Sequence, residues 1–212
     1  MKKFELRKDR FDFFESFEKP QLHITVKFEC PNFLDYCKKE KIPPFHFFLF
    51  CFCQAIKKVD NFCYRIYENK VIKVDKFIPT YTVINKNNDL NFTRFYASDN
   101  LESFIQDSIK SKNEAMNSEK LINIVSGENQ RELKDALFIT SFPWFDYSSI
   151  DYPAFQFKSA DTPSFAWGKF SKTSDNKIEM PFSIQAHHGF VDGFHVYQLL
   201  TEISKCIEEN IK

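Results

Sequence analysis

The sequence predicts an α/β fold in which helices cover a sheet. Two observations support this prediction: segments with the period-two pattern of strands alternate with helical segments along the chain, and hydrophobic residues make up 43% of the 212 residues, which is sufficient for a sizeable core. No run rich in Pro, Gly or Ser divides the chain, so we expect residues 1–212 to form a single domain.

The N-terminal part is predicted to contain three helices and one strand. Residues 5–18 suit a short aromatic helix, residues 21–29 alternate like a strand, and residues 32–40 suit a second short helix. Residues 43–58 begin with two prolines, as many helices do, and are apolar on nearly every side. Such a helix is normally central and covered on several faces.

The remaining two thirds of the chain are predicted to contain most of the sheet. Asp99 is expected to cap a helix that buries Leu101, Phe104 and Ile105, with Glu102 completing a capping-box pattern. The last helix is predicted at residues 193–211, with apolar residues on one face. Strand-like segments lie at residues 63–67, 70–75, 78–84, 90–97, 136–142, 164–171 and 178–188.

Charge and motif content exclude several classes of protein. Lys plus Arg and Asp plus Glu both number 29, and this zero balance argues against a general nucleic-acid binder. Neither GxGxxG nor the Walker-type GxxxxGK occurs, which disfavours dinucleotide and NTP sites. The N-terminus lacks the apolar region of a signal peptide, and no apolar run approaches the ~20 residues that span a bilayer. We therefore expect a soluble cytoplasmic protein that binds no nucleic acid or membrane.

The cysteines and aromatic residues indicate a reduced, ring-rich interior. None of the six cysteines forms a CxxC pair, and Cys51 and Cys53 lie in a Phe-rich run that suggests buried, reduced thiols. The chain has 27 Phe and only 4 Gly. One domain of this size rarely buries so many rings, so we expect some to line a pocket or a subunit interface.

The clearest chemical signal lies at residues 177–196. Because strand side chains alternate between faces, His187 and His188 are expected to point in opposite directions, which makes them poor partners for one metal ion. A histidine at a strand end in an apolar setting can serve as a general base near neutral pH. On the residues alone, the alternative is that His188 is an ordinary core histidine and Asp192 caps the next helix.

Four segments of the chain resemble chloramphenicol acetyltransferases. QAHHGFVDGFHV (185–196) is similar to that family's HHxxxDG active-site segment. ITSFPW (139–144) resembles its Ser-x-x-Pro-Trp segment, GKFSKTSDNKIEMPFSIQ (168–185) its Gly-Lys-aromatic and Met-Pro-Leu pattern, and RKDRFDFF (7–14) its N-terminal segment. The HHxxxDG motif also occurs in dihydrolipoyl acyltransferase cores and peptide-synthetase condensation domains, but those proteins are much longer.

The resemblance implies a two-layer α/β sandwich with a mixed sheet and an acetyl-CoA-dependent O-acetyltransferase without a metal. His188 would take the proton from an acceptor hydroxyl, which attacks the thioester directly in a ternary complex. Thr140 stands where the family has an oxyanion-stabilising Ser, and Ser141 is expected on the opposite face. Asp192 and Arg7 would form a buried pair that holds the catalytic turn.

The resemblance also implies binding positions and an assembly. Trp144 and Phe170 would border the acetyl-CoA tunnel, and Lys169 would lie near the CoA phosphates. Phe14 and His23 would lie in the acceptor pocket. In this family the sites lie between the subunits of a homotrimer, with the histidine from one subunit and pocket residues from its neighbour.

Three differences from the family pattern weaken the assignment of chloramphenicol as the acceptor. Phe14 replaces a Tyr whose hydroxyl helps to bind the drug, residues 20–24 differ from the pocket segment, and Ala166 replaces a Thr. A pocket with fewer polar groups recognises a polyhydroxy drug less strictly. Two alternatives therefore stay open: an acyltransferase for another small hydroxyl or amine acceptor, and a catalytically silent relative, which the Thr at position 140 would favour.

Overall fold

A computed structural model describes residues 2–122, 129–153 and 161–212 of the chain. The strands are β1 (Gln21–Pro31), β2 (Tyr64–Tyr67), β3 (Lys70–Lys73), β4 (Ile78–Ile84), β5 (Leu90–Phe92), β6 (Ala136–Ser141), β7 (Ser164–Trp167), β8 (Ser171–Lys172) and β9 (Lys177–His187). The main sheet has the order β1-β9-β7-β6-β4-β5, with β8 beside β9, and β2 and β3 form a separate hairpin. The sheet is mixed, because β4, β6 and β7 are parallel and the other pairs are antiparallel.

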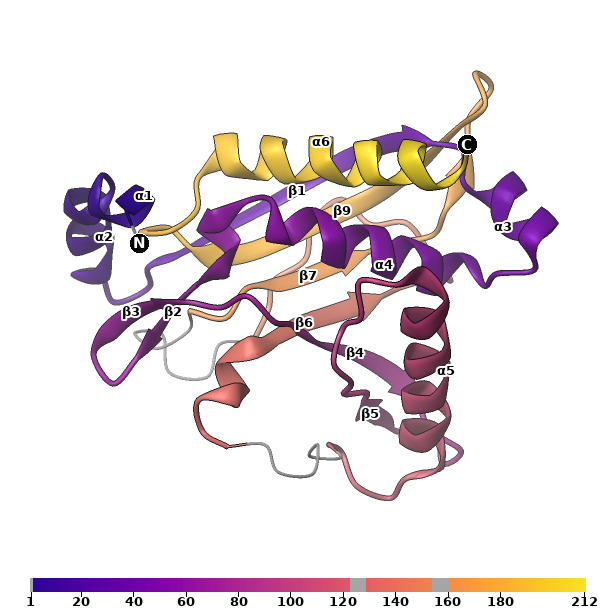
Figure 1. Cartoon of the computed structure of the whole chain (residues 1–212), viewed down its shortest axis with the longest axis horizontal. Coiled ribbons are helices and arrows are strands. Elements are labelled where there is room, and N and C mark those ends of the chain that lie inside the picture. The colour runs from indigo at the N-terminus through magenta and orange to yellow at the C-terminus, as the bar shows by residue number, and fades with distance from the viewer. Residues whose placement is uncertain (1, 123–128, 154–160) are drawn as a thin grey trace.

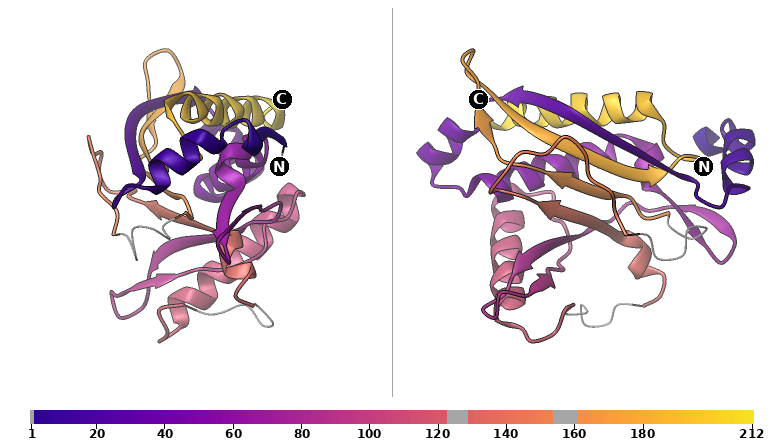
Figure 2. Two further views of the ribbon diagram at one scale, coloured as in Figure 1. Left: turned by 90° about the vertical axis from the view of Figure 1, so that its left-hand side faces the viewer. Right: turned by 180° about the vertical axis from the view of Figure 1, so that it is seen from behind.

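Helices cover one face of this sheet, as Figure 1 shows for α4 and α6, which pack side by side. The helices are α1 (Lys2–Glu5), α2 (Lys8–Glu15), α3 (Leu34–Glu40), α4 (Pro44–Lys57), α5 (Leu101–Asn117) and α6 (Gly193–Asn210), with 3-10 turns at Asp60–Cys63 and Glu132–Asp135. Figure 2 shows the opposite face of the sheet from behind. The predicted α/β fold with helices on a mixed sheet is confirmed.

The core between the layers consists largely of aromatic rings. Phe48 and Phe52 of α4 meet Trp167 and Phe165 of β7 edge to face, with ring centroids 5.0 Å and 4.6 Å apart. Such pairs contribute about 0.5–1.5 kcal/mol each beyond the area they bury. The predicted central position of the Phe-rich helix is confirmed, and all six cysteines are buried and unpaired, as expected for Cys51 and Cys53.

The second face of the sheet carries polar residues that are nevertheless buried near its centre. Ser183, Gln185 and His187 alternate along β9 and are almost inaccessible to solvent. The segment after β6 covers part of this face, because the hydroxyl of Tyr147 donates to the carbonyl of Ala166 at 2.9 Å and that of Tyr152 to the carbonyl of Ser183 at 3.2 Å.

The structure corrects two of the predicted helices. The helix predicted at residues 5–18 is two helices, α1 and α2, because the chain turns at Arg7 and its guanidinium reaches another part of the fold. The cap of α5 is Asn100, whose side chain accepts from the N–H of Ser103 at 2.9 Å, whereas Asp99 pairs with Lys57.

Two predicted strands are also shorter. The strand predicted at residues 90–97 ends at Phe92, and the one at residues 164–171 is β7 followed by the separate β8. Within the described part of the chain, no helix has the length and apolar character needed to cross a bilayer.

Candidate active site

The residues predicted for the site lie at two ends of the sheet. His188, Asp192, Arg7 and Phe14 gather where β9 ends beside α2, and His23 lies nearby on β1. The other group, Thr140, Trp144 and Phe170, lines a cavity beyond the carboxyl ends of β4, β6 and β7. Because β9 runs antiparallel to β7, these ends face in opposite directions.

His188 lies just beyond β9 with its imidazole held by the backbone. Its Nδ1 is 3.0 Å from the carbonyl oxygen of Val191, which can only accept, so Nδ1 carries the proton and Nε2 presents a lone pair. The backbone N–H of His188 donates to the carbonyl of Pro20 at 2.7 Å. The ring of Phe14 stacks on the imidazole with centroids 3.9 Å apart. Among the described residues, none makes a hydrogen bond to Nε2, so this atom is free to accept a proton from a substrate.

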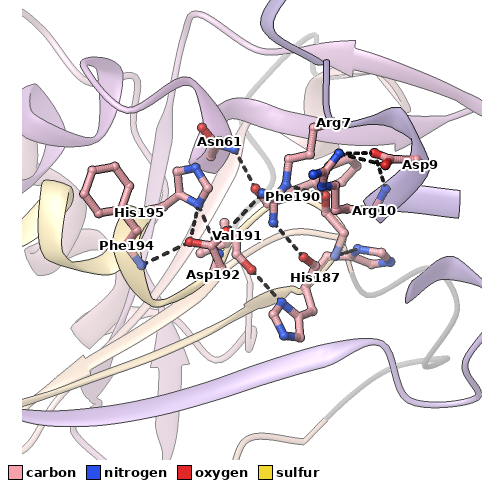
Figure 3. Close-up of polar contacts among 12 residues, drawn as sticks. Arg7, Asp9, Arg10, Asn61, His187, Phe190, Val191, Asp192, Phe194 and His195 are labelled. Atoms are coloured by element: carbon pink, nitrogen blue, oxygen red, sulfur yellow. Dashed lines mark hydrogen bonds and ion pairs between the residues drawn. The ribbon is translucent and has the colours of Figure 1, made fainter. Parts of the chain in front are cut away.

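Arg7 joins the N-terminal segment to this turn. One Nη donates to Asp192 Oδ2 at 3.0 Å (Figure 3). Its Nε donates to the carbonyl of Gly189 at 2.8 Å, and the other Nη donates to the carbonyl of His188 at 3.2 Å. Three fixed donors therefore meet three acceptors within five consecutive residues. A planar guanidinium suits this task better than a Lys ammonium, because its N–H groups point in fixed directions.

Asp192 also caps the N-terminus of α6. Its Oδ1 accepts from the N–H of Phe194 at 3.0 Å, and Nδ1 of His195 accepts from the N–H of Asp192 at 3.1 Å, which completes a reciprocal cap. Burial raises the pKa of Asp192, but His195 and Arg7 outweigh it and leave this pKa below its ordinary value. Burial lowers the pKa of His195, which agrees with a neutral ring whose Nδ1 accepts.

His23 lies on the sheet face away from the helices. Its Nδ1 is 3.3 Å from an Asp151 carboxylate oxygen, and its Nε2 is 3.3 Å from the side-chain nitrogen of Gln185. An amide nitrogen donates, so Nδ1–H faces Asp151 and Nε2 faces Gln185. Burial, with a contribution from Lys19, lowers the pKa of His23, and Asp151 opposes this only in part.

At the other end of the sheet, a cavity of about 630 Å³ has mostly apolar walls. Tyr81 and Met116 form part of the wall, and neither was predicted, because their approach depends on how β4 packs against α5. Trp144 stands at this cavity with 68% of its surface exposed. Lys169 is exposed and does not line the cavity, whereas Lys112 of α5 does.

Thr140 and Ser141 both line this cavity and are both half-buried. Because β6 ends at Ser141, the strand end brings both residues to the cavity wall. That Ser141 faces away from Thr140 stays a prediction. In the described residues, neither hydroxyl has a hydrogen-bond partner. Each is available to donate to a bound group.

His188 and Thr140 are too far apart to act together in one chain. Thr140 lies opposite Ala166, which lies opposite Ser183 in β9. His188 comes five residues after Ser183, which corresponds to roughly 16 Å along an extended strand, and two strand spacings add roughly 10 Å sideways. A hydroxyl donor and a base must lie within a few ångströms of one reacting group, so one chain does not assemble them.

A family model described as chloramphenicol acetyltransferase matches residues 2–204. The chain belongs to the chloramphenicol acetyltransferase family. The match includes every predicted site residue, at both ends of the sheet.

Curated relatives support this family over nearly their whole length. A chloramphenicol acetyltransferase of Escherichia coli is 26% identical over 205 residues, covering 96% of this chain and 90% of the relative. One from Staphylococcus aureus is 28% identical over 215 residues, covering 95% and 93%. Members of the chloramphenicol acetyltransferase family are acyltransferases, so this chain belongs to an enzyme family of that class.

Solved structures show the same fold. A chloramphenicol acetyltransferase structure has a TM-score of 0.81 at 23% identity, covering 95% of this chain and 94% of the other. A probable dihydrolipoamide acetyltransferase from Listeria monocytogenes has a TM-score of 0.64 at 13% identity, covering 97% and 91%. The fold is thus shared with CoA-dependent acyltransferases.

Two contacts of the turn were not predicted from the sequence. Asn61 donates to the carbonyl of Phe190 at 2.7 Å, and no local pattern around residue 61 signals this long-range contact. His195 completes the cap of α6, and its position three residues after Asp192 was a usable signal.

Proposed function

We propose that this protein transfers the acetyl group of acetyl-CoA to a hydroxyl of chloramphenicol or a related small molecule. The observation that carries the proposal is His188, whose Nδ1 proton faces a backbone carbonyl while its Nε2 has no partner among the described residues. A base prepared in this way typically accelerates a proton transfer ~100- to 10,000-fold.

The reaction follows from the chemistry of these residues. Nε2 of His188 removes the proton of the acceptor hydroxyl as its oxygen attacks the thioester carbonyl. The Thr140 hydroxyl donates to the oxyanion of the tetrahedral intermediate. Collapse of the intermediate forms the ester and expels the CoA thiolate, which takes the proton held by His188. Arg7 and Asp192 hold the turn and exchange no proton.

The separation of the two ends supports a site shared between copies of the chain. His188 of one copy would meet the Thr140 end of its neighbour, and a closed ring of three copies would contain three equivalent sites. Exposed rings supply apolar surface for such contacts, since Phe194 and Tyr197 at the start of α6 are 64% and 65% exposed. We therefore propose a homotrimer.

The cavity supports a role in binding the donor. Its apolar walls suit the pantetheine arm of acetyl-CoA, and Trp144 and Phe170 would border that arm. Lys112 at the wall and the exposed Lys169 are candidates for the CoA phosphates. We place the donor there and the acceptor beside His188, Phe14 and His23. We also propose a cytoplasmic location, where acetyl-CoA and an antibiotic acceptor would meet.

The test is a thiol-release assay with purified protein, acetyl-CoA and chloramphenicol, with His188→Ala as the control. Free CoA that depends on both chloramphenicol and His188 supports the proposal. If chloramphenicol gives no release while acetyl-CoA still raises the melting temperature, the donor site stands and chloramphenicol is not the acceptor. If neither occurs, the protein is a catalytically silent relative.

A different acceptor is favoured by Phe14. Its ring lies on His188 and carries no hydroxyl, and Ala166 likewise adds no polar group to the sheet. In a direct comparison, Phe14→Tyr would add a hydrogen-bonding group beside the base. A lower KM for chloramphenicol in that variant, with an unchanged KM for other alcohols, would show that the natural pocket is built for a less polar acceptor.

A further inference from the structure

The first histidine of the motif, His187, has no part in the proposed chemistry, yet it is the more deeply buried of the two. Its side chain is 0% exposed. Nδ1 accepts from the N–H of Gly189 at 3.1 Å, and Nε2 lies 2.8 Å from Oε2 of Glu15 on α2. A buried imidazole between a backbone donor and a carboxylate is bound at both nitrogens.

These contacts fix the tautomer of His187. Because Gly189 donates to Nδ1, the ring proton lies on Nε2 and points to the Glu15 carboxylate. Burial lowers the pKa of His187, although Glu15 and Asp161 raise it, and a neutral ring agrees with an accepting Nδ1. His188 has the opposite tautomer, with the proton on Nδ1.

Packing leaves this ring little freedom. The rings of Phe11 and Phe190 lie 5.6 Å and 5.1 Å from it, centroid to centroid. A Cβ on Gly189 would come within 3.0 Å of two His187 ring atoms and of the Phe11 backbone. The glycine therefore allows the turn to approach both the imidazole and α2.

Two hydrogen bonds hold the peptide unit that joins His188 to Gly189, one on each side. The carbonyl of His188 accepts from Arg7, and the N–H of Gly189 in the same peptide donates to His187. Rotation of this peptide would break both bonds at once, so the two bonds together fix the backbone that directly follows the base.

We propose that Glu15 is a positioning residue, which sets the tautomer of His187 so that its Nδ1 holds the peptide following His188. The proposal rests on the proposed function, because it assigns Glu15 an effect on the base. Glu15→Ala removes the acceptor for Nε2–H, so the proton can move to Nδ1, where it opposes the N–H of Gly189. Misplacement of a base by about 1 Å can cost about 100-fold in rate.

The expected result is a kcat lowered roughly 10- to 100-fold in Glu15→Ala. The KM for acetyl-CoA should stay near that of the wild type, since the donor cavity lies at the other end of the sheet. Glu15→Gln should retain most of kcat, because its side-chain carbonyl still accepts from Nε2–H. Asp12→Ala is the matched control, since that carboxylate on the same helix pairs with Lys8 at the surface.

A second readout needs no turnover. Nitrogen-15 NMR distinguishes the two imidazole tautomers, and the signals of His187 among the five histidines can be assigned by their loss in His187→Asn. We expect the Nε2–H form in the wild type and in Glu15→Gln, and a shift towards Nδ1–H in Glu15→Ala.

Any one of three results would overturn the proposal. The tautomer of His187 could be unchanged in Glu15→Ala, or Glu15→Gln could lose as much kcat as Glu15→Ala. Glu15→Ala could also have a lowered melting temperature and a normal kcat. A wild type that acetylates no acceptor would refute the proposed function instead. The tautomer signals would then still decide whether Glu15 controls His187.

Discussion

The two ends of the sheet are built in contrasting ways. At the His188 end, the turn after β9 is held by Arg7, Asn61 and the cap of α6. At the cavity end, the walls are mainly apolar, and the hydroxyls of Thr140 and Ser141 have no partner in the described structure. One end is preorganised before any substrate arrives, and the other presents space and free donors.

This contrast matches the separate tasks proposed for the two ends. A base must keep its orientation while it moves a proton, so its supports are internal and fixed. A donor pocket must admit a long, flexible molecule, so its groups are free until that molecule binds. Variants at the two ends should therefore differ in which kinetic constant they change.

The largest effect is expected for His188→Ala. Loss of the base should lower kcat by ~100- to 10,000-fold, with little change in the KM for acetyl-CoA. Steady-state kinetics with varied acetyl-CoA checks this, and an unchanged melting temperature would show that the fold is intact. Activity within about tenfold of the wild type would remove His188 from the role of base.

The next effect is expected at the cavity end. Thr140→Val keeps the shape of the side chain but removes the hydroxyl, which should cost ~100- to 1,000-fold in kcat. Thr140→Ser is the matched control and should remain close to the wild type. Ser141→Ala tests the neighbouring hydroxyl. If it costs more than Thr140→Val, the oxyanion donor is Ser141.

A smaller effect on rate, but a clear one on stability, is expected for Arg7→Ala. The variant leaves Asp192 and two carbonyls without their donor, which should lower the free energy of unfolding by about 2 kcal/mol. The folded pKa of Asp192 lies below the ordinary 3.8. The contribution of the pair is therefore complete above that value and is lost as the pH falls through the folded pKa.

Denaturant unfolding at several pH values measures this directly. The difference in stability between the wild type and Arg7→Ala should be largest near neutrality and shrink in acid. A difference that does not change with pH would mean that the carbonyl contacts of Arg7 matter and its pairing with Asp192 does not.

The smallest effect on the fold itself is expected at Gly193, the glycine of the HHxxxDG motif. A Cβ there would meet no atom within 4 Å in the single chain. Gly193→Ala should therefore leave the melting temperature of the subunit unchanged or slightly raised. A drop in kcat or in assembly would then show that a substrate or a neighbouring copy approaches this position. If neither kcat nor assembly changes, Gly193 does not line the shared site.

Local patterns in the sequence predicted the elements better than the way they meet. The Phe-rich helix, the period-two pattern of β9 and the amphipathic α6 are local signals, and the structure contains all three. The choice of Asp99 as a cap was wrong. Asn100 and Asp99 are equally good caps by residue type, but the structure uses Asn100 as the cap and pairs Asp99 with Lys57.

The site residues divide in the same way. The motif placed His188 and Asp192 on one turn, because they are only four residues apart. The contact between Arg7 and Asp192 joins residues 185 positions apart, and only the family resemblance suggested it. Tyr81 and Met116 reach the cavity through the packing of β4 and α5, for which a single sequence carries no periodic signal.

The central claim is that each site needs His188 from one copy of the chain and Thr140 from another. The most direct measurement mixes two inactive proteins, His188→Ala and Thr140→Val, by joint unfolding and refolding, and then measures acetyl transfer. Sites in which an intact His188 meets an intact Thr140 should form at random, so the mixture should regain activity up to about a quarter of the wild type. A mixture no more active than its two components would contradict the claim and would place the whole site within one chain.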